Sequence, residues 1–232
     1  VALHAALALA TRRARVGCLV YNVSYRSPAV IAKATATIDH LSRGRAVVGL
    51  GAGYLRHEYE KFGIEFPPTA DRSALLARSV REVRRLLDEV VRPAPLQTHL
   101  PIFIGGGGEQ RTIPTTAMIA DGWNLAMPTL DDFTRKNATL SRHAEAAGRD
   151  PSSIERTVSL GLCFDEVDLP RRFGERWETL RSAVLFGSTQ QVVDKVAEYR
   201  AAGADTIILS LRHPYDTDEI ERFAREVMAV AS

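Results

Sequence analysis

Short apolar segments alternate with amphipathic ones along the whole chain, and this alternation limits the folds open to it. Each apolar segment is bounded by glycine, proline or polar residues, which is typical of buried strands. Apolar strands separated by helices indicate a parallel sheet with helices covering its faces. The predicted strands are residues 15–21, 46–52, 101–105, 122–126, 158–164 and 206–211.

The amphipathic segments predict helices, several of them with recognisable ends. Pro28 lies in the first turn of one, where a proline is tolerated. Ser188 and Gln191 have the spacing of a capping box that begins another, and Gly203 ends it. Residues 1–11 resemble the tail of a helix whose preceding strand is absent. The other predicted helices span 28–41, 72–91, 130–147 and 216–230.

No linker, low-complexity stretch or charge block interrupts the chain, so we expect a single domain over residues 1–232. Two architectures fit the pattern: an open doubly wound sheet and a closed (β/α)₈ barrel. A closed barrel needs eight strands, and we identify only the six given above. Strand number alone therefore favours the open sheet.

Composition excludes several classes of function. The chain has a formal net charge of +2 with both signs interspersed, which argues against nucleic acid or an acidic membrane as partner. No segment approaches the ~20 apolar residues of a membrane span. Cys18 and Cys163 lie in apolar segments, so we expect two reduced thiols and no metal site. These features predict a cytoplasmic protein.

Two predicted strands end in glycines, Gly49, Gly51 and Gly53 in one case and Gly105–Gly108 in the other. Glycine lets backbone N–H groups come close to an anion, and a following helix adds unpaired N–H groups. The spacing matches neither the dinucleotide fingerprint nor a Walker A loop. Tight turns remain the alternative, but four consecutive glycines favour a bound phosphate.

These blocks, in this order and spacing, resemble the luciferase-like monooxygenase superfamily, which includes the coenzyme F420-dependent oxidoreductases. The resemblance covers nearly the whole chain and implies a (β/α)₈ barrel. The first predicted strand aligns with the family's third, so the family's first two strands have no counterpart here. The matching segments are residues 15–21, 25–33, 38–45, 48–54, 58–59, 62–64, 72, 101–108, 120–124, 148–151, 187–189 and 201–204.

The resemblance also implies positions for the cofactor. Residues Leu19 and Val20 would lie behind the flavin ring, on a bulge that in the family often includes a non-prolyl cis peptide. In the family the loop equivalent to Gly51–Gly53 approaches the ring or the ribityl chain. The expected cofactor-binding residues are Leu19, Val20, Ala52, Gly53, His57, Gly105, Gly106 and Gly107.

For some side chains the sequence leaves two interpretations open. His57 is either a cofactor contact or a solvated residue at the start of a helix. Trp123 is expected to pack in the core, whereas Asn124 could face the pocket. Tyr54 stands where some sugar-phosphate-oxidising members have a catalytic glutamate, which argues against that activity. Catalytic residues stay unassigned, because the family places them in the part that has no counterpart here.

The resemblance therefore implies an oxidoreductase that transfers hydride between coenzyme F420 and a small organic substrate, acting as a homodimer. One alternative is an FMN-dependent monooxygenase that uses reduced flavin and O₂. Another is a non-catalytic, cofactor-binding subunit. No metal is expected in any of the three cases.

Overall fold

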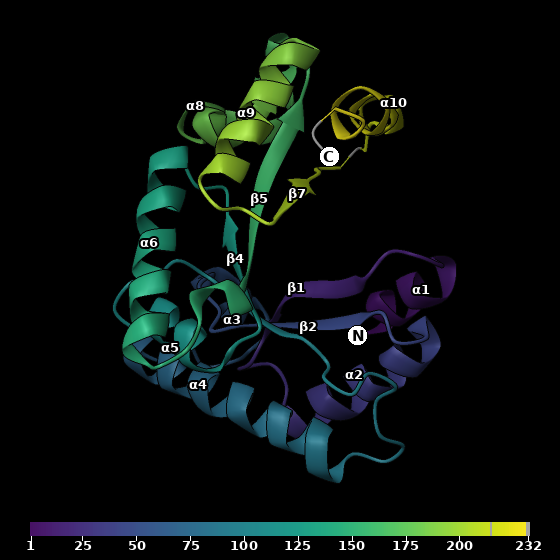
Figure 1. Cartoon of the computed structure of the whole chain (residues 1–232), viewed down its shortest axis with the longest axis vertical. Coiled ribbons are helices and arrows are strands. Elements are labelled where there is room, and N and C mark those ends of the chain that lie inside the picture. The colour runs from purple at the N-terminus through teal and green to yellow at the C-terminus, as the bar shows by residue number, and fades with distance from the viewer. Residues whose placement is uncertain (214, 231–232) are drawn as a thin grey trace. The chain divides into compact units, whose positions relative to one another are not determined.

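The computed structural model describes residues 1–213 and 215–230, which form two compact units (Figure 1). The first unit comprises Val1–Trp123 and His143–Ile154, and the second comprises Asn124–Arg142 and Glu155–Ser232. Strand β4 (Gly122–Ala126) and helix α6 (Leu130–Ala146) each contribute residues to both units. The expectation of one domain over 1–232 stays a prediction.

The first unit contains three parallel strands and the helices that follow them. Strand β1 pairs with β2, and β2 pairs with β3, with Val16 opposite Ala46 and Val48 opposite Ile102. The strands predicted at 15–21, 46–52 and 101–105 are confirmed to within one residue at each end. The elements are α1 (Ala2–Ala10), β1 (Val16–Asn22), α2 (Pro28–Ser42), β2 (Ala46–Gly51), α3 (Arg56–Lys61), α4 (Thr69–Arg85) with a π-helical turn (Leu86–Val90), β3 (Ile102–Gly105) and α5 (Thr112–Ile119).

The core of this unit lies between the strands and helices α2 and α4. Strand side chains such as Leu50 and Ile104 are fully buried, as is Val83 of α4. Burying one side chain of this size stabilises the fold by about 1.5–3 kcal/mol. Helix α2 starts as expected: Ser27 accepts a hydrogen bond from Val30 N–H, and Pro28 follows it.

Helix α1 is held against β1 by two buried polar contacts. His4 lies between the Tyr21 hydroxyl (2.9 Å) and the Val16 carbonyl (3.0 Å). A carbonyl only accepts, so Nε2 carries the proton and Nδ1 accepts from Tyr21. Burial lowers the pKa of His4, which agrees with a neutral ring. At the end of α1, Arg45 donates to the carbonyls of Ala8 and Thr11.

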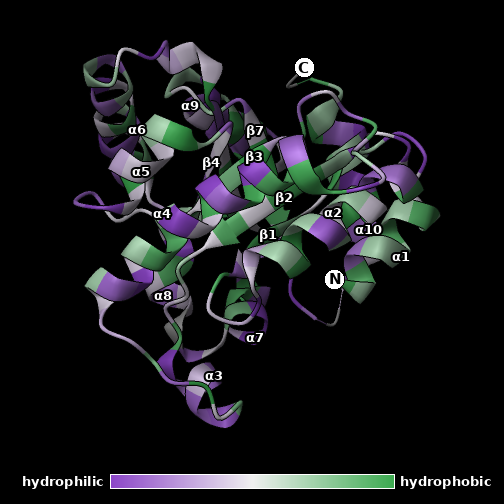
Figure 2. Ribbon diagram, turned by 90° about the horizontal axis from the view of Figure 1, so that it is seen from below, coloured by the Kyte–Doolittle hydropathy of each residue, from purple (hydrophilic) through white to green (hydrophobic). Residues whose placement is uncertain are grey.

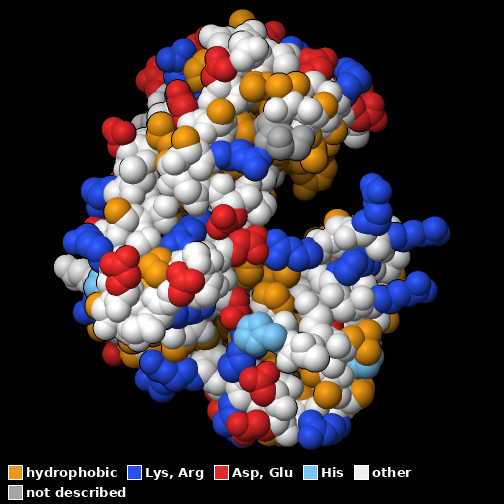
Figure 3. Space-filling model, viewed as in Figure 1, with side chains coloured by type: hydrophobic (Ala, Val, Ile, Leu, Met, Phe, Trp, Pro, Cys, Tyr) orange, Lys and Arg blue, Asp and Glu red, His pale blue; other side chains and the backbone are white. Residues whose placement is uncertain are grey.

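Helix α1 is apolar over most of its length, as its colour in Figure 2 shows. Only His4 and Ala8 are buried in it, whereas Leu3 and Leu9 are 73% and 68% exposed. On the face that Figure 3 shows, side chains of both charges occur, and several Lys and Arg side chains gather without acidic neighbours at the right edge. This distribution agrees with the small formal net charge of +2.

The second unit is built around a long strand, β5, which pairs in parallel with β6 and with β7. Strand β6 is absent from the sequence prediction, because its three residues are too few to show a period. The capping box of Ser188 and Gln191 is confirmed. The main elements are β5 (Glu155–Cys163), α7 (Leu169–Phe173), α8 (Trp177–Leu180), β6 (Val184–Phe186), α9 (Thr189–Ala201), β7 (Thr206–Ser210) and α10 (Thr217–Arg222), which a π-helical segment (Phe223–Met228) continues.

Two kinds of feature are absent from the part of the chain that the structure describes. Among residues 1–213 and 215–230, no helix is both long and apolar enough to cross a membrane. In the same residues no three His, Cys, Asp or Glu side chains gather in a way that could hold a metal ion. Cys18 and Cys163 are both free thiols, as expected.

We predict that Glu226 makes the stability of the second unit depend on pH. Hydrogen bonds from Thr189 (2.7 Å) and Arg222 (3.0 Å) lower the pKa of Glu226 from 4.5 to about 2. A carboxylate with a depressed pKa in the folded state stabilises that state above its unfolded pKa, and the contribution disappears as pH falls. The free energy of unfolding of the wild type should therefore exceed that of Glu226→Gln by a constant amount near neutrality. This difference should shrink between pH 4.5 and about 2.

Urea unfolding of both proteins across this pH range measures that difference. Glu178→Gln, at an exposed position of α8, is the matched control for the loss of one surface carboxylate. A wild-type advantage over Glu226→Gln that does not change with pH would contradict the assignment.

Candidate cofactor site at the ends of the first three strands

The carboxyl ends of β1, β2 and β3 lie side by side, because the three strands are parallel and paired in register. Asn22 lies opposite Gly51, and Leu50 lies opposite Ile104. The residues that follow these strands therefore share one edge of the sheet. This edge brings together the predicted cofactor residues of β1, the first glycine loop and the four-glycine turn. In parallel α/β proteins, ligands bind at this end of the strands.

Strand β1 is irregular near its end. Its register against β2 shifts between Cys18 and Tyr21, and the Leu19–Val20 peptide is cis. The family resemblance implied both a bulge and a non-prolyl cis peptide at this point. Leu19 is 42% exposed, so its side chain is open to contact from outside the sheet.

The side chain of Val20 explains why two of these loop positions are occupied by glycine. A Cβ atom on Gly51 would lie 2.3 Å from one methyl group of Val20, and a Cβ on Gly105 would lie 2.7 Å from the other. A Cβ on Gly49 would lie 2.2 Å from the Cys18 carbonyl oxygen. These glycines make room for the bulge of β1. An excess of glycine therefore indicates a ligand only at Gly106 and Gly107, since a Cβ on Gly108 would also lie 2.9 Å from Thr112 Oγ1.

Beyond Gly105 the turn exposes its backbone. Gly106 has φ of +130°, a conformation that L side chains rarely adopt. In the described part of the chain, the N–H groups of Gly106, Gly107 and Gly108 donate to no acceptor. The Gly108 carbonyl, in contrast, accepts from Ile113 N–H at 2.9 Å and so joins the turn to α5. Unpaired N–H groups before a helix suit an anion such as phosphate.

The loop after β2 is fixed by side chains that the sequence prediction missed. Tyr59 of α3 bonds through its hydroxyl to Asn22 (2.9 Å) and to the Ala52 carbonyl (3.3 Å). Buried Arg72 of α4 donates from Nε to the Gly53 carbonyl at 3.1 Å. Gly53 has φ of +73°, and a Cβ there would lie 2.2 Å from the Tyr59 hydroxyl. Ala52 and Gly53 are therefore held in one conformation.

The remaining candidate cofactor contacts are less closely connected to the glycine turn. His57 lies exposed in the first turn of α3, and no contact among the described residues joins it to the glycine turn. Gln110 and Arg111, two side chains that follow that turn closely enough to be considered as additional contacts, are exposed. Asn124 is buried and donates to the hydroxyls of Thr157 (2.9 Å) and Ser159 (3.1 Å) within the second unit. Its side-chain amide is therefore hydrogen-bonded within the core of the second unit.

Burial also makes the nearby ionisable groups unreactive. It raises the pKa of the Cys18 thiol, which therefore stays protonated at neutral pH. It raises the pKa of the Tyr21 hydroxyl to about 12. Neither group is suited to general acid–base work near neutrality, where a catalytic pKa should lie close to the operating pH. The end of β1 therefore contributes a shaped surface and backbone groups to the candidate site, and neither of these two side chains serves as an acid or base.

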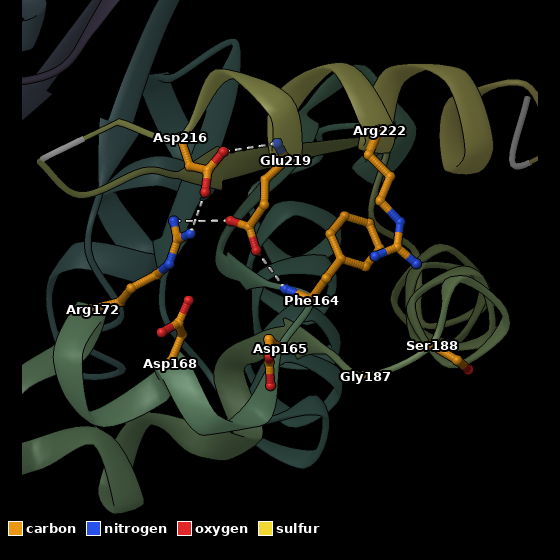
Figure 4. A pocket seen from close by; sticks show the side chains of 9 residues that line it. All are labelled: Phe164, Asp165, Asp168, Arg172, Gly187, Ser188, Asp216, Glu219 and Arg222. Carbon is orange, nitrogen blue, oxygen red and sulfur yellow. Dashed lines mark hydrogen bonds and ion pairs between the residues drawn. The ribbon is translucent and has the colours of Figure 1, made fainter.

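A separate cleft of about 510 Å³ lies within the second unit (Figure 4). Arg172 crosses it and pairs with Asp216 (2.8 Å) and Glu219 (2.9 Å), as the dashed lines in Figure 4 show. Burial raises the pKa of Glu219, and Glu219 also accepts from Phe164 N–H at 2.7 Å. One guanidinium thus pairs with two carboxylates and joins α7 to α10, while the hydrogen bond from Phe164 to Glu219 joins α10 to the end of β5. The lining residues are Phe164, Asp165, Asp168, Arg172, Gly187, Ser188, Asp216, Glu219 and Arg222.

Comparison with solved structures identifies the fold. The chain aligns over its full length with an F420-dependent secondary alcohol dehydrogenase solved with an F420–acetone adduct, with a TM-score of 0.85, 19% identity and 84% coverage of that chain. It also aligns with the oxygenating constituent of 3,6-diketocamphane monooxygenase from Pseudomonas putida in complex with FMN, with a TM-score of 0.80, 16% identity and 83% coverage of that chain. At these identities the similarity shows the fold alone, and the predicted luciferase-like α/β fold is confirmed.

Sequence comparison identifies the family. The luciferase-like monooxygenase family matches residues 1–168, and the chain belongs to this family. An uncharacterised protein of Mycobacterium tuberculosis is 32% identical over 216 residues, which is 86% of this chain and 72% of that protein. The F420-dependent glucose-6-phosphate dehydrogenase of Kineococcus radiotolerans is 32% identical over 178 residues, 69% of this chain. The chain spans 52% of the length of that enzyme.

We predict that Gly51→Ala destabilises the first unit through Val20. The added methyl group would overlap a Val20 methyl, and overpacking of this kind costs about 1–3 kcal/mol. The substitution Val20→Ala should relieve the overlap. The double variant should therefore be less destabilised than the sum of the two single variants, by about 0.5–3 kcal/mol. Chemical denaturation of the four proteins measures this coupling, and strictly additive effects would show that Gly51 is required for another reason.

Proposed function

We propose that this protein is an oxidoreductase that transfers hydride between coenzyme F420 and a small organic substrate. The observation that carries the proposal is the row of unpaired N–H groups from Gly106 to Gly108, at the same strand edge as the bulge of β1. An anion bound to the turn would place the rest of the cofactor along this edge. The N–H groups, exposed and before a helix, fit a cofactor phosphate.

The proposed cofactor contacts follow from the arrangement of the strand ends. Gly105, Gly106 and Gly107 would hold the phosphate through the backbone. Leu19 and Val20 would support the ring from the bulge, and Ala52 and Gly53 would border the ring or its ribityl chain. When bound, a deazaflavin supplies or accepts two electrons as hydride. The chain's own contribution is to bind that group and to fix its orientation, which hydride transfer requires.

The substrate is proposed only as a class. Relatives include an F420-dependent glucose-6-phosphate dehydrogenase and a ketoreductase acting on phthiodiolone dimycocerosates, the latter 30% identical over 65% of this chain. Tyr54, which is 80% exposed, stands where some sugar-phosphate-oxidising members have a glutamate. We therefore favour an alcohol or carbonyl compound over a sugar phosphate. The resemblance also supports a cytoplasmic homodimer as the working form.

The second candidate is an FMN-dependent monooxygenase. The observation that favours it is the same glycine turn, because backbone N–H groups bind the phosphate of FMN as well as that of F420. In that case reduced FMN and O₂ would replace the hydride transfer as the chemistry. His57 stays a proposed contact in either case, since its exposed ring on α3 has no fixed partner among the described residues.

Titration of the purified protein with F420 and with FMN, followed by fluorescence, tests the proposal. We expect F420 to bind at least about tenfold more tightly than FMN. Reduced F420 should then be reoxidised in the presence of a ketone or aldehyde from a small panel, without consumption of O₂. Preferential FMN binding with O₂ uptake would favour the monooxygenase. Binding of neither cofactor would contradict both proposals, and binding without turnover would favour a non-catalytic subunit.

A further inference from the structure

Trp123 is connected to the glycine turn by a directed hydrogen bond. Its side chain is fully buried at the end of the first unit, and its Nε1–H donates to the Gly106 carbonyl at 2.8 Å. The sequence alone suggested only core packing for this residue. The acceptor is notable because Gly106 itself is exposed, so the contact runs from the core to the surface turn that we propose binds phosphate.

This contact determines where the next backbone N–H points. The peptide that joins Gly106 to Gly107 is trans, and in a planar trans peptide the C=O and N–H groups point in opposite directions. With the Gly106 oxygen directed to the buried indole, the Gly107 N–H is directed away from it. That N–H has no acceptor among residues 1–213 and 215–230.

The conformation of Gly106 supports the same interpretation. Its φ of +130° is accessible to glycine and rarely to other residues, so this orientation of the turn requires glycine at position 106. One indole hydrogen bond holds the peptide in that orientation. In the absence of this bond, the Gly106–Gly107 peptide could rotate because water can satisfy an exposed carbonyl.

We propose that Trp123 is a positioning residue for the anion site: it holds the Gly106 carbonyl so that the Gly107 N–H faces a cofactor phosphate. The inference rests on the proposed function, since it assigns a role within the same site. The competing explanation is that the Gly106 carbonyl serves only to satisfy a buried indole N–H, as buried tryptophans require. The two explanations differ in which part of the ligand's affinity depends on Trp123.

The test compares ligands that differ in their phosphate. FMN is paired with riboflavin, and F420 is paired with its deazariboflavin fragment, which lacks the phosphate and the tail. The ratio of the two dissociation constants in each pair measures what the phosphate adds. Trp123→Phe removes the N–H group and keeps an aromatic ring. Trp177→Phe, in the second unit, is the matched control because it removes the other tryptophan of the chain.

For Trp123→Phe we expect the phosphate ratio to fall about tenfold, the size of one lost hydrogen bond, with little change for the phosphate-free ligands. Trp177→Phe should keep the wild-type ratio. If Trp123→Phe does not fold, a benzothienyl analogue of tryptophan incorporated in the Trp177→Phe background replaces the N–H by sulfur and preserves the shape. Thermal melting confirms that each variant is folded.

The outcomes separate the inference from the function on which it rests. An unchanged phosphate ratio in Trp123→Phe, or an equal loss for both members of a pair, overturns the positioning role and leaves the proposed function standing. A wild type that binds phosphate-free ligands as tightly as FMN and F420 contradicts the phosphate turn itself. A selective loss of the phosphate ratio supports both.

Discussion

The arrangement of the candidate site depends on where the side chain of Val20 lies. The bulge of β1 directs this branched side chain across the neighbouring strand ends, where its two methyl groups occupy the space that Cβ atoms on Gly51 and Gly105 would need. A branched side chain has little rotational freedom, so it acts as a rigid spacer between the strands. The three strand ends therefore pack around this one side chain.

This dependence changes how the glycine-rich loops should be understood. From the sequence, both loops looked like places where a ligand approaches the backbone. The structure assigns Gly49, Gly51 and Gly105 to packing against β1, whereas Gly106 and Gly108 are exposed and Gly107 is half-buried. A sequence shows that a residue lacks a side chain but not which neighbour uses the space. That neighbour comes from a strand about 30 residues away for Gly51, and further for Gly105.

In the rest of the molecule, too, features set by local sequence could be predicted, whereas features set by distant neighbours could not. Strands and helices with clear periodicity or caps, such as α2 and α9, could be located to within a few residues because local chemistry determines them. The short strand β6 could not, since its pairing with β5 rather than its own sequence makes it a strand. Trp123, Tyr59 and Arg72 were missed as supports of the site, because their hydrogen bonds to loop carbonyls span 7 to 19 residues.

Charge at the glycine turn bears on which phosphate it would accept. Between Gly105 and Ile119 the formal charges are one anion, Glu109, and one cation, Arg111, which cancel. Backbone N–H groups at a helix start supply only about half an elementary charge. FMN carries a phosphate monoester with close to two negative charges near neutrality, whereas the phosphate of F420 is a diester with one. A turn that relies on backbone groups, with no net side-chain charge between Gly105 and Ile119, balances a singly charged phosphodiester better than a doubly charged monoester.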